Sequence, residues 1–249
     1  MDNSNHNITD RTAIVTGGST GIGESICRHF LDAGYTVINL ARRRATIDDE
    51  RLLNYEVDLA DRQATRAVAN TISDQFRVDT LVHNAGLIRA ALIEDVQLED
   101  LDYLTEIHLG AAITLLQACL PAMKAKGFGR VIAISSRAML GLETRTNYAA
   151  TKAAMIGQTR TWAMELGQYG ITVNAVAPGP IAATEMFHNV IKEGDPKIDQ
   201  MAQTIPVKRV GAPADVARAV LFLADADNSF ITGQTLFVCG GASLGSLAL

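Results

Sequence analysis

The 249-residue sequence has few of the residues that mark several classes of protein. It contains three cysteines, an odd number scattered through apolar segments, which indicates free buried thiols in a reducing compartment rather than a disulfide framework. No two of its five histidines stand at a metal-ligand spacing and no Cys/His cluster occurs, so the sequence predicts no metal site. No apolar run reaches the roughly 18 residues that a membrane span needs.

A large excess of charge of one sign is also missing. The net charge is −5 and the one tight basic run is Arg42–Arg44, which leaves no electrostatic footprint for nucleic acid or for an anionic membrane. Residues 1–10 are polar and lack the apolar segment of a secretory signal, so we expect a disordered tail and a cytoplasmic protein. The remaining residues, 11–249, contain no repeat or linker and suit one large α/β domain.

The chain does have an alternation of β-branched apolar runs with segments of helical periodicity. Such alternation predicts βαβ units, a parallel sheet and ligands at the carboxyl ends of the strands. Residues 183–208 have no clear period and mix apolar with charged side chains, as a substrate lid would. The predicted strands are 12–16, 35–40, 53–57, 79–83, 129–135, 171–176 and 235–238, and the predicted helices are 24–33, 61–77, 97–124, 148–168 and 213–224.

A glycine-rich turn, TGGSTGIG at 16–23, joins the first strand to the first helix. A turn in this place offers backbone N–H groups and a helix N-terminus to a phosphate. Residues 17–21 also fit G-x-S-x-G, the nucleophile elbow of serine hydrolases. A hydrolase would need an acid and then a histidine downstream, and the last histidine, His188, follows no predicted strand. We therefore favour the phosphate-binding interpretation.

The end of the second strand bears on the choice of cofactor. An acidic residue there would bond the adenosine 2′-hydroxyl of NAD, whereas an arginine accommodates the 2′-phosphate of NADP. This chain has Ala41 followed by Arg42–Arg44, with no carboxylate before Asp48. NADP(H) is therefore favoured and NAD(H) remains possible; the alternative is that these arginines belong to a solvated loop.

Tyr148 and Lys152 stand four residues apart near the start of a long helical pattern and so share one helix face. A free tyrosine has a pKa of about 10, and a nearby cation lowers it by favouring the phenolate. The pair can therefore act as a tunable general acid/base. The motif alone is weak, because an amphipathic surface pair explains it equally well.

Five motifs together give a more specific signal. TGGSTGIG at 16–23, NAG at 84–86, Ser136, YAATK at 148–152 and PG at 178–179 occur in the order of the short-chain dehydrogenase/reductase family, which the chain resembles over about residues 10–245. The resemblance, which includes 3-oxoacyl-thioester reductases and related carbonyl reductases, implies a Rossmann-type doubly wound sheet of seven parallel strands with helices on both faces. It also implies a homotetramer that transfers hydride between NADP(H) and a ketone or secondary alcohol.

The resemblance also implies the catalytic roles. Tyr148 would exchange a proton with the substrate oxygen, and Lys152 would lower the pKa of Tyr148 and hold the nicotinamide ribose. Ser136 would polarise the substrate oxygen; Ser135 is the alternative, but neighbours on a strand face opposite ways. His108 stands where the family usually has an asparagine that supports a proton relay to the lysine, and a purely structural histidine is the other interpretation.

For the cofactor, the resemblance points to residues in the loops that follow the strands. Tight turn packing explains the glycines among them equally well, and the segment before Thr184 holds one extra residue relative to the family. Two further functions stay open, an NAD-dependent alcohol dehydrogenase and a dinucleotide-binding sensor without turnover. The expected cofactor-binding residues are Gly17, Ser19, Thr20, Gly21, Ile22, Gly23, Arg42, Asp58, Leu59, Asn84, Ala85, Gly86, Tyr148, Lys152, Pro178, Gly179, Ile181 and Thr184.

Overall fold

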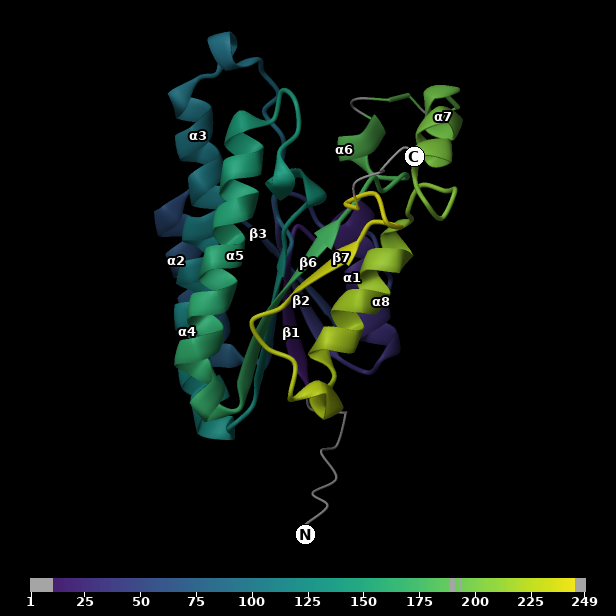
Figure 1. The fold of residues 1–249 in the computed structure, drawn as a ribbon. Helices are drawn as coiled ribbons and strands as arrows, with labels where there is room; N and C mark the ends of the chain where they lie inside the picture. Colours follow the sequence, from purple (N-terminus) through teal and green to yellow (C-terminus); the bar gives the residue numbers. More distant parts are fainter. Residues whose placement is uncertain (1–10, 189–190, 193, 245–249) are drawn as a thin grey trace.

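A computed structural model describes residues 11–188, 191–192 and 194–244; the expected tail at 1–10 lies outside the described residues. The fold is built on a parallel sheet with the strand order β3-β2-β1-β4-β5-β6-β7, which confirms the prediction of seven parallel strands (Figure 1). The strands are β1 (Thr12–Thr16), β2 (Thr36–Ala41), β3 (Leu52–Glu56), β4 (Thr80–His83), β5 (Gly129–Ile134), β6 (Ile171–Pro178) and β7 (Thr235–Val238).

Helices cover both faces of the sheet, as the doubly wound arrangement requires (Figure 1). Successive strand residues face opposite ways, so Val15 packs with α1 and α8 on one face, while Ile14 packs with α2, α4 and α5 on the other. Because both faces are buried, the central strands read as nearly continuous apolar runs. These helices are α1 (Gly21–Asp32), α2 (Arg62–Gln75), α4 (Ala111–Lys126), α5 (Thr146–Leu166) and α8 (Pro213–Ala224).

The strand order reverses beside β1, which lies between β2 and β4. Ligands of open α/β sheets bind at such a switch point, outside the carboxyl ends of the strands. Here the two strand ends are tied together, because the Thr16 hydroxyl accepts hydrogen bonds from the backbone N–H groups of Asn84 and Ala85, each over 2.9 Å. The glycine-rich turn after β1 and the loop after β4 therefore form one surface.

The helical stretch Leu98–Lys126 is not one regular helix. A π-helical turn, η3 (Glu106–Gly110), interrupts it between α3 (Leu98–Thr105) and α4. Within the described residues this stretch alone is long and apolar enough to cross a membrane, by length and composition only; 44% of its most apolar window is buried inside the fold, as in a core helix of a packed domain. Short 3-10 turns complete the structure: η2 (Ile93–Asp95), η4 (Arg137–Leu140), η5 (Gly167–Tyr169) and η6 (Ala226–Asn228).

The segment 183–208, predicted as a lid, carries two short helices, α6 (Glu185–His188) and α7 (Lys197–Thr204); its residues 189, 190 and 193 lie outside the described part. Figure 1 places both helices beyond the carboxyl end of β6. The base of the segment is closed by two backbone hydrogen bonds of 2.9 Å, from Gly211 to Pro180 and from Ala182 to Gly211.

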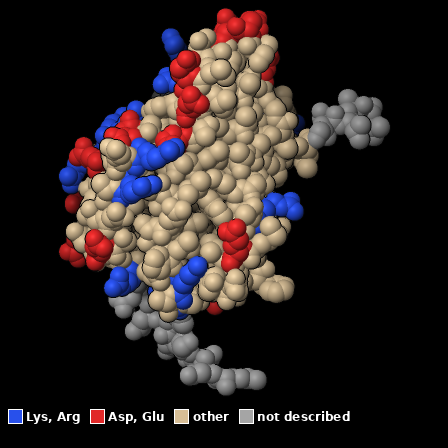
Figure 2. Space-filling model, turned by 90° about the vertical axis from the view of Figure 1, so that its left-hand side faces the viewer, with Lys and Arg blue, Asp and Glu red and all other residues tan. Residues whose placement is uncertain are grey.

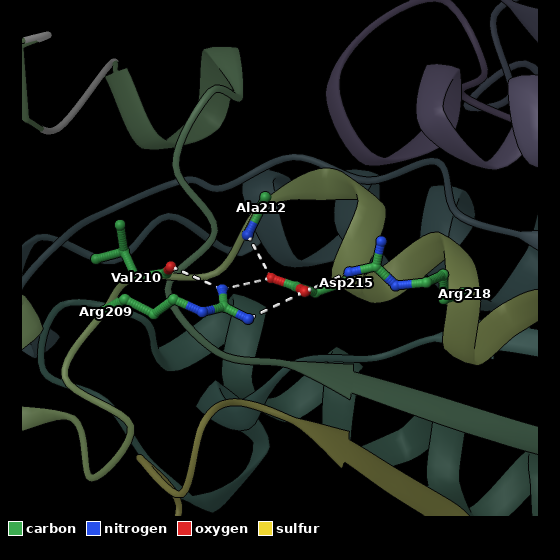
Figure 3. A network of polar contacts seen from close by, with 5 residues as sticks. All are labelled: Arg209, Val210, Ala212, Asp215 and Arg218. Carbon is green, nitrogen blue, oxygen red and sulfur yellow. Dashed lines mark hydrogen bonds and ion pairs between the residues drawn. The ribbon is translucent and has the colours of Figure 1, made fainter.

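Beyond that base, Asp215 fixes the chain to the start of α8. Its carboxylate accepts hydrogen bonds from Arg209, from Arg218 and from the Ala212 backbone N–H (Figure 3). These bonds, the Arg209 bond first among them, lower the pKa of Asp215 to about 2. The chain that leaves the segment 183–208 is therefore anchored where it enters α8.

Candidate active site

Ser136 and Tyr148 meet at the carboxyl end of β5. Ser136 caps η4, with its Oγ accepting from the Ala138 N–H over 3.1 Å, and its side chain is hydrogen-bonded to the Tyr148 phenol. The Ser135 hydroxyl instead donates to the Lys152 carbonyl over 2.8 Å and so ties β5 to α5. Of the two serines, only Ser136 faces the phenol.

The pKa of Tyr148 is raised above its ordinary value. Burial of the phenol is the main cause, and the hydrogen bond with Ser136 and the positive charge of Arg145 act in the lowering direction without outweighing it. The expectation that Lys152 lowers this pKa therefore does not describe the net shift, because removal from water dominates. The phenol stays protonated at neutral pH and is ready to donate a proton.

Lys152 lies beside the Tyr148 ring and is buried. Its Nζ donates to the Ile134 carbonyl over 2.7 Å, lies 3.6 Å from the Met155 sulfur and stands 5.7 Å from the centre of the Tyr148 ring. Burial lowers the pKa of Lys152 to about 7. The ammonium and the neutral amine are therefore both populated near neutral pH, which suits a group that holds and releases a proton.

His108 lies on the π-helical turn and is fully buried. Its Nδ1 is 2.8 Å from the Thr151 hydroxyl oxygen, which also reaches the carbonyls of Asn147 and Tyr148 at 3.0 and 3.1 Å. Because the Thr151 hydroxyl donates its hydrogen to a carbonyl, its oxygen accepts from Nδ1–H, and we assign Nε2 as a bare acceptor. Nε2 has no partner in the described chain, and burial lowers the pKa of His108, so the ring is neutral.

The acceptor of His108 and the amine of Lys152 meet at Gly86. A Cβ atom on Gly86 would stand 2.7 Å from His108 Nε2 and 3.3 Å from Lys152 Nζ. The His108 ring also packs edge-on against the Tyr148 ring, with centroids 5.7 Å apart. The structure thus brings together the four expected catalytic residues, Ser136, Tyr148, Lys152 and His108, from the start of η4 after β5, from α5 and from the π-helical turn.

The glycine-rich turn fits a dinucleotide pyrophosphate. A Cβ on Gly23 would overlap the Gly17 carbonyl oxygen, and Gly21 opens α1 with a φ of +58°, so side chains are kept off the turn. Thr20 is the N-cap residue of α1 but makes no side-chain capping bond, which leaves its hydroxyl available at the helix N-terminus. The Asn84 side-chain amide supports the turn by donating hydrogen bonds to the Thr16 and Gly17 carbonyls.

Asn39 is a contributor to the turn that the sequence analysis missed. This fully buried amide on β2 accepts from the Gly18 N–H over 2.8 Å and donates to Asn54 over 2.8 Å. The feature of the sequence that could have indicated Asn39 is an amide side chain inside the apolar run TVINL. Buried polar groups are usually hydrogen-bonded, so such a residue predicts a partner but does not say which.

The remaining expected cofactor residues lie in loops and strand ends at the same edge of the sheet. Asp58 is exposed and Leu59 buried just after β3, while Ile22 packs partly buried on α1. Gly179 follows Pro178 at the end of β6 and donates to the Val238 carbonyl over 3.0 Å. Ile181 is buried in a bridge to Gly211, and the Thr184 hydroxyl oxygen accepts from the Phe187 N–H over 3.1 Å.

The nucleophile-elbow alternative finds no support at Ser19. Its hydroxyl donates to the Arg43 carbonyl, and the nearest expected partner, His188, lies on α6 with its Nδ1 3.3 Å from the Ile191 carbonyl oxygen. His83 is also occupied, with Nδ1 at 3.2 Å from the Thr16 hydroxyl and Nε2 at 3.0 Å from the Ile107 carbonyl. Within the described residues, no group of three or more potential ligands could hold a metal ion.

Comparison with known proteins identifies the class. The family model described as enoyl-(acyl carrier protein) reductase matches residues 17–243. The (2S)-[(R)-hydroxy(phenyl)methyl]succinyl-CoA dehydrogenase subunit BbsD of Thauera aromatica is 36% identical, over 95% of this chain and 98% of the relative. The acetoacetyl-CoA reductase of Rhizobium meliloti is 37% identical, over 93% and 98%.

Solved structures agree with this assignment. The ligand-free aldohexose dehydrogenase of Thermoplasma acidophilum superposes with a TM-score of 0.89 at 28% identity, over 97% of each chain. ElxO with NADP bound gives 0.86 at 31% identity, over 94% of this chain and 98% of the other. Sheet, glycine turn and matched relatives thus define an NAD(P)-dependent oxidoreductase. The chain belongs to the short-chain dehydrogenase/reductase family.

Proposed function

We propose that the protein transfers a hydride between NADP(H) and a ketone or secondary alcohol, with Tyr148 as the general acid/base. The observation that carries this proposal is the hydrogen bond between the Ser136 hydroxyl and the Tyr148 phenol beside Lys152. When bound, the nicotinamide supplies or accepts the hydride. Tyr148 donates its proton to the substrate oxygen during reduction, and Ser136 donates a hydrogen bond to the same oxygen as its negative charge develops.

Tyr148 must regain the proton it donates, and we assign this step to Lys152 and His108. The pKa of Lys152, lowered by burial to about 7, allows its amine to pass a proton at neutral pH. His108 Nε2 is a neutral acceptor beside Nζ at Gly86. We infer that Lys152 passes a proton to Tyr148 and regains it from solvent through water, which the His108 Nε2 acceptor would orient.

We infer a preference for NADP(H), with NAD(H) as the alternative cofactor. The loop after β2 has no carboxylate at the strand end, and the side chains of Arg42 and Arg44 make no ion pair within the described chain. Free guanidinium groups at this position are suited to the 2′-phosphate. A structural relative, ElxO, was solved with NADP bound.

For the substrate we propose a carbonyl compound with an apolar body, of the 3-oxoacyl thioester type. The Ala91 N–H donates to the Thr144 carbonyl over 3.1 Å, so the loop before η2 adjoins the loop before Tyr148. Both loops carry exposed apolar side chains, among them Leu92 and Leu142. The acetoacetyl-CoA reductase and 3-oxoacyl reductase relatives act on acyl thioesters by name, which supports this class.

Tyr148→Phe tests the mechanism, because it keeps the ring and removes the proton. We expect kcat to fall by about 10²–10⁴-fold, the range for a lost general acid, while titration with NADPH gives an unchanged dissociation constant. Retained turnover would refute the mechanism. A wild-type protein that binds NADPH but turns over no ketone or alcohol in a broad panel would support the sensor alternative.

We further propose a cytoplasmic homotetramer. Figure 2 shows a broad area without charged residues on the side formed by α2, α3, α4 and α5. On α5, Met164 is 78% exposed. A second region, near α8 and β7, exposes Phe222, Phe230 and Leu236. We assign these two regions to the two kinds of contact that a tetramer needs. All three cysteines are free, which fits a reducing compartment. A monomer in light scattering would refute the assembly.

A further inference from the structure

An ion pair joins two distant segments at the carboxyl edge of the sheet. Arg43, in the loop after β2, binds Glu185, the first residue of α6, although 142 positions separate them. Arg43 Nη2 donates to both carboxylate oxygens, at 2.9 and 2.8 Å. The two side chains are 63% and 58% exposed, so the pair lies in contact with water. No other ion pair of the described chain reaches the segment 183–208 from the β2 loop.

Both residues of the ion pair belong to segments that contact the glycine-rich turn. The Ser19 hydroxyl donates to the Arg43 carbonyl, which holds the β2 loop against the turn. On the other side, Thr184 precedes Glu185, and its Cγ2 lies 3.2 Å from where a Cβ on Gly21 would stand. The ion pair therefore bridges the turn that offers its N–H groups to a pyrophosphate.

The chain around Glu185 leaves and rejoins the fold at a base held by hydrogen bonds. The hydrogen bonds of Gly211 with Pro180 and Ala182 close that base, and Asp215 anchors it to α8 (Figure 3). Just inside the base, Ala183 and Lys208 have φ angles of +56° and +58°, which side-chain-bearing residues rarely adopt. Such strain collects at hinges and ligand clamps. A contact at Glu185 would hold the strained segment closed.

We propose that Arg43 and Glu185 form a clasp that retains the dinucleotide: the pair closes over the bound cofactor and opens for its release. This rests on the proposed dinucleotide binding, and it holds for both cofactors because it does not need the 2′-phosphate. The Nε and Nη1 groups of Arg43 make no hydrogen bond within the described chain, so they stay available to a phosphate while Nη2 holds Glu185.

The test is the rate at which bound NADH leaves the protein, followed by nicotinamide fluorescence in a stopped-flow displacement with excess NAD⁺. We expect Arg43→Gln and Glu185→Gln each to speed NADH release about two- to fivefold, the range for an exposed ion pair. The double variant should be no faster than either single variant, because one interaction is lost. The charge swap Arg43→Glu with Glu185→Arg should bring release back toward the wild-type rate.

Arg66→Gln is the control, since it removes one exposed positive charge from α2, outside the cofactor loops, without breaking an ion pair; NADH release should not change. High salt should speed release from the wild type and leave Glu185→Gln unaffected, because salt screens exposed pairs. Unchanged release in both single variants, or additive effects in the double variant, would overturn the clasp. So would a Glu185→Gln variant that slows NADPH release, since Glu185 would then only compete with the phosphate. Failure of the wild type to bind either dinucleotide would instead refute the proposed function.

Discussion

His108 donates its Nδ1–H to the Thr151 hydroxyl oxygen over 2.8 Å in the buried centre of the site. Thr151 is one residue before Lys152 on α5, so a single helical turn both presents the lysine and sets the tautomer of the histidine facing it. The bare Nε2 acceptor beside Lys152 is a consequence of this bond.

Removing the Thr151 hydroxyl should disturb the tautomer without touching the cofactor. We expect Thr151→Val to lower kcat about tenfold, equivalent to 1.4 kcal/mol, with an unchanged NADPH dissociation constant, because Nδ1 loses its acceptor. Thr151→Ser should restore the rate. A variant that loses stability but keeps kcat would show that Thr151 is only structural.

His108 itself can be tested by replacement. We expect His108→Asn to retain most turnover, since the amide also donates and accepts, and His108→Leu to lose it. The measurement is kcat of each variant, at saturating cofactor and substrate, compared with kcat of the wild type. Equal activity of both variants would remove His108 from the proton path.

The two serines after β5 form a matched pair. Ser136→Ala should reduce kcat about 10²–10³-fold, the cost of losing one donor to a developing oxyanion. Ser135→Ala should leave kcat nearly unchanged and reduce the free energy of unfolding by about 1 kcal/mol, because it loses its bond to the Lys152 carbonyl and its weaker contact with the Met139 sulfur. The reverse ranking in kcat would refute the assignment.

Burial of Lys152 should appear in the pH dependence of stability. Its pKa is about 7 in the folded protein against 10.5 for the unperturbed group, so between these values the unfolded state binds more protons. Stability therefore gains as pH rises from about 7 to 10.5, and the gain is absent below pH 7. Lys152→Met should flatten this rise in urea unfolding, while the exposed Lys124→Met should not.

Arg145 should tune Tyr148 through its charge. Because that charge lowers the Tyr148 pKa, Arg145→Gln should raise it, and the decline of ketone reduction at alkaline pH should move to higher pH. The pH–rate profile of kcat measures this shift. Arg89→Gln, at a residue paired with Asp100, is the control and should leave the profile in place.

Arg42 should decide the cofactor preference. We expect NADPH to bind the wild type at least about tenfold more tightly than NADH, or 1.4 kcal/mol, and Arg42→Gln to abolish this difference while NADH binding stays constant. Fluorescence titration of the nicotinamide ring gives both constants. Equal binding of the two cofactors by the wild type would mean that the arginines belong to a solvated loop and do not recognise the 2′-phosphate.

Local sequence determined much of this protein. Alternating apolar runs specified seven parallel strands, and the glycines between the first strand and helix specified a turn without side chains, because both are set by nearest neighbours along the chain. Helix periodicity likewise placed Tyr148 and Lys152 on one face of α5. These features could be predicted without knowing which elements pack against each other.

Only the tertiary structure decided which groups meet and how their surroundings change them. The Tyr148 pKa rises because the whole fold buries the phenol, an effect that the four-residue spacing to Lys152 does not encode. The π-helical turn aims His108 at Thr151, and Arg43 reaches Glu185 across 142 positions. Burial and long-range contact depend on how all the elements pack together, which is why no local pattern predicted them.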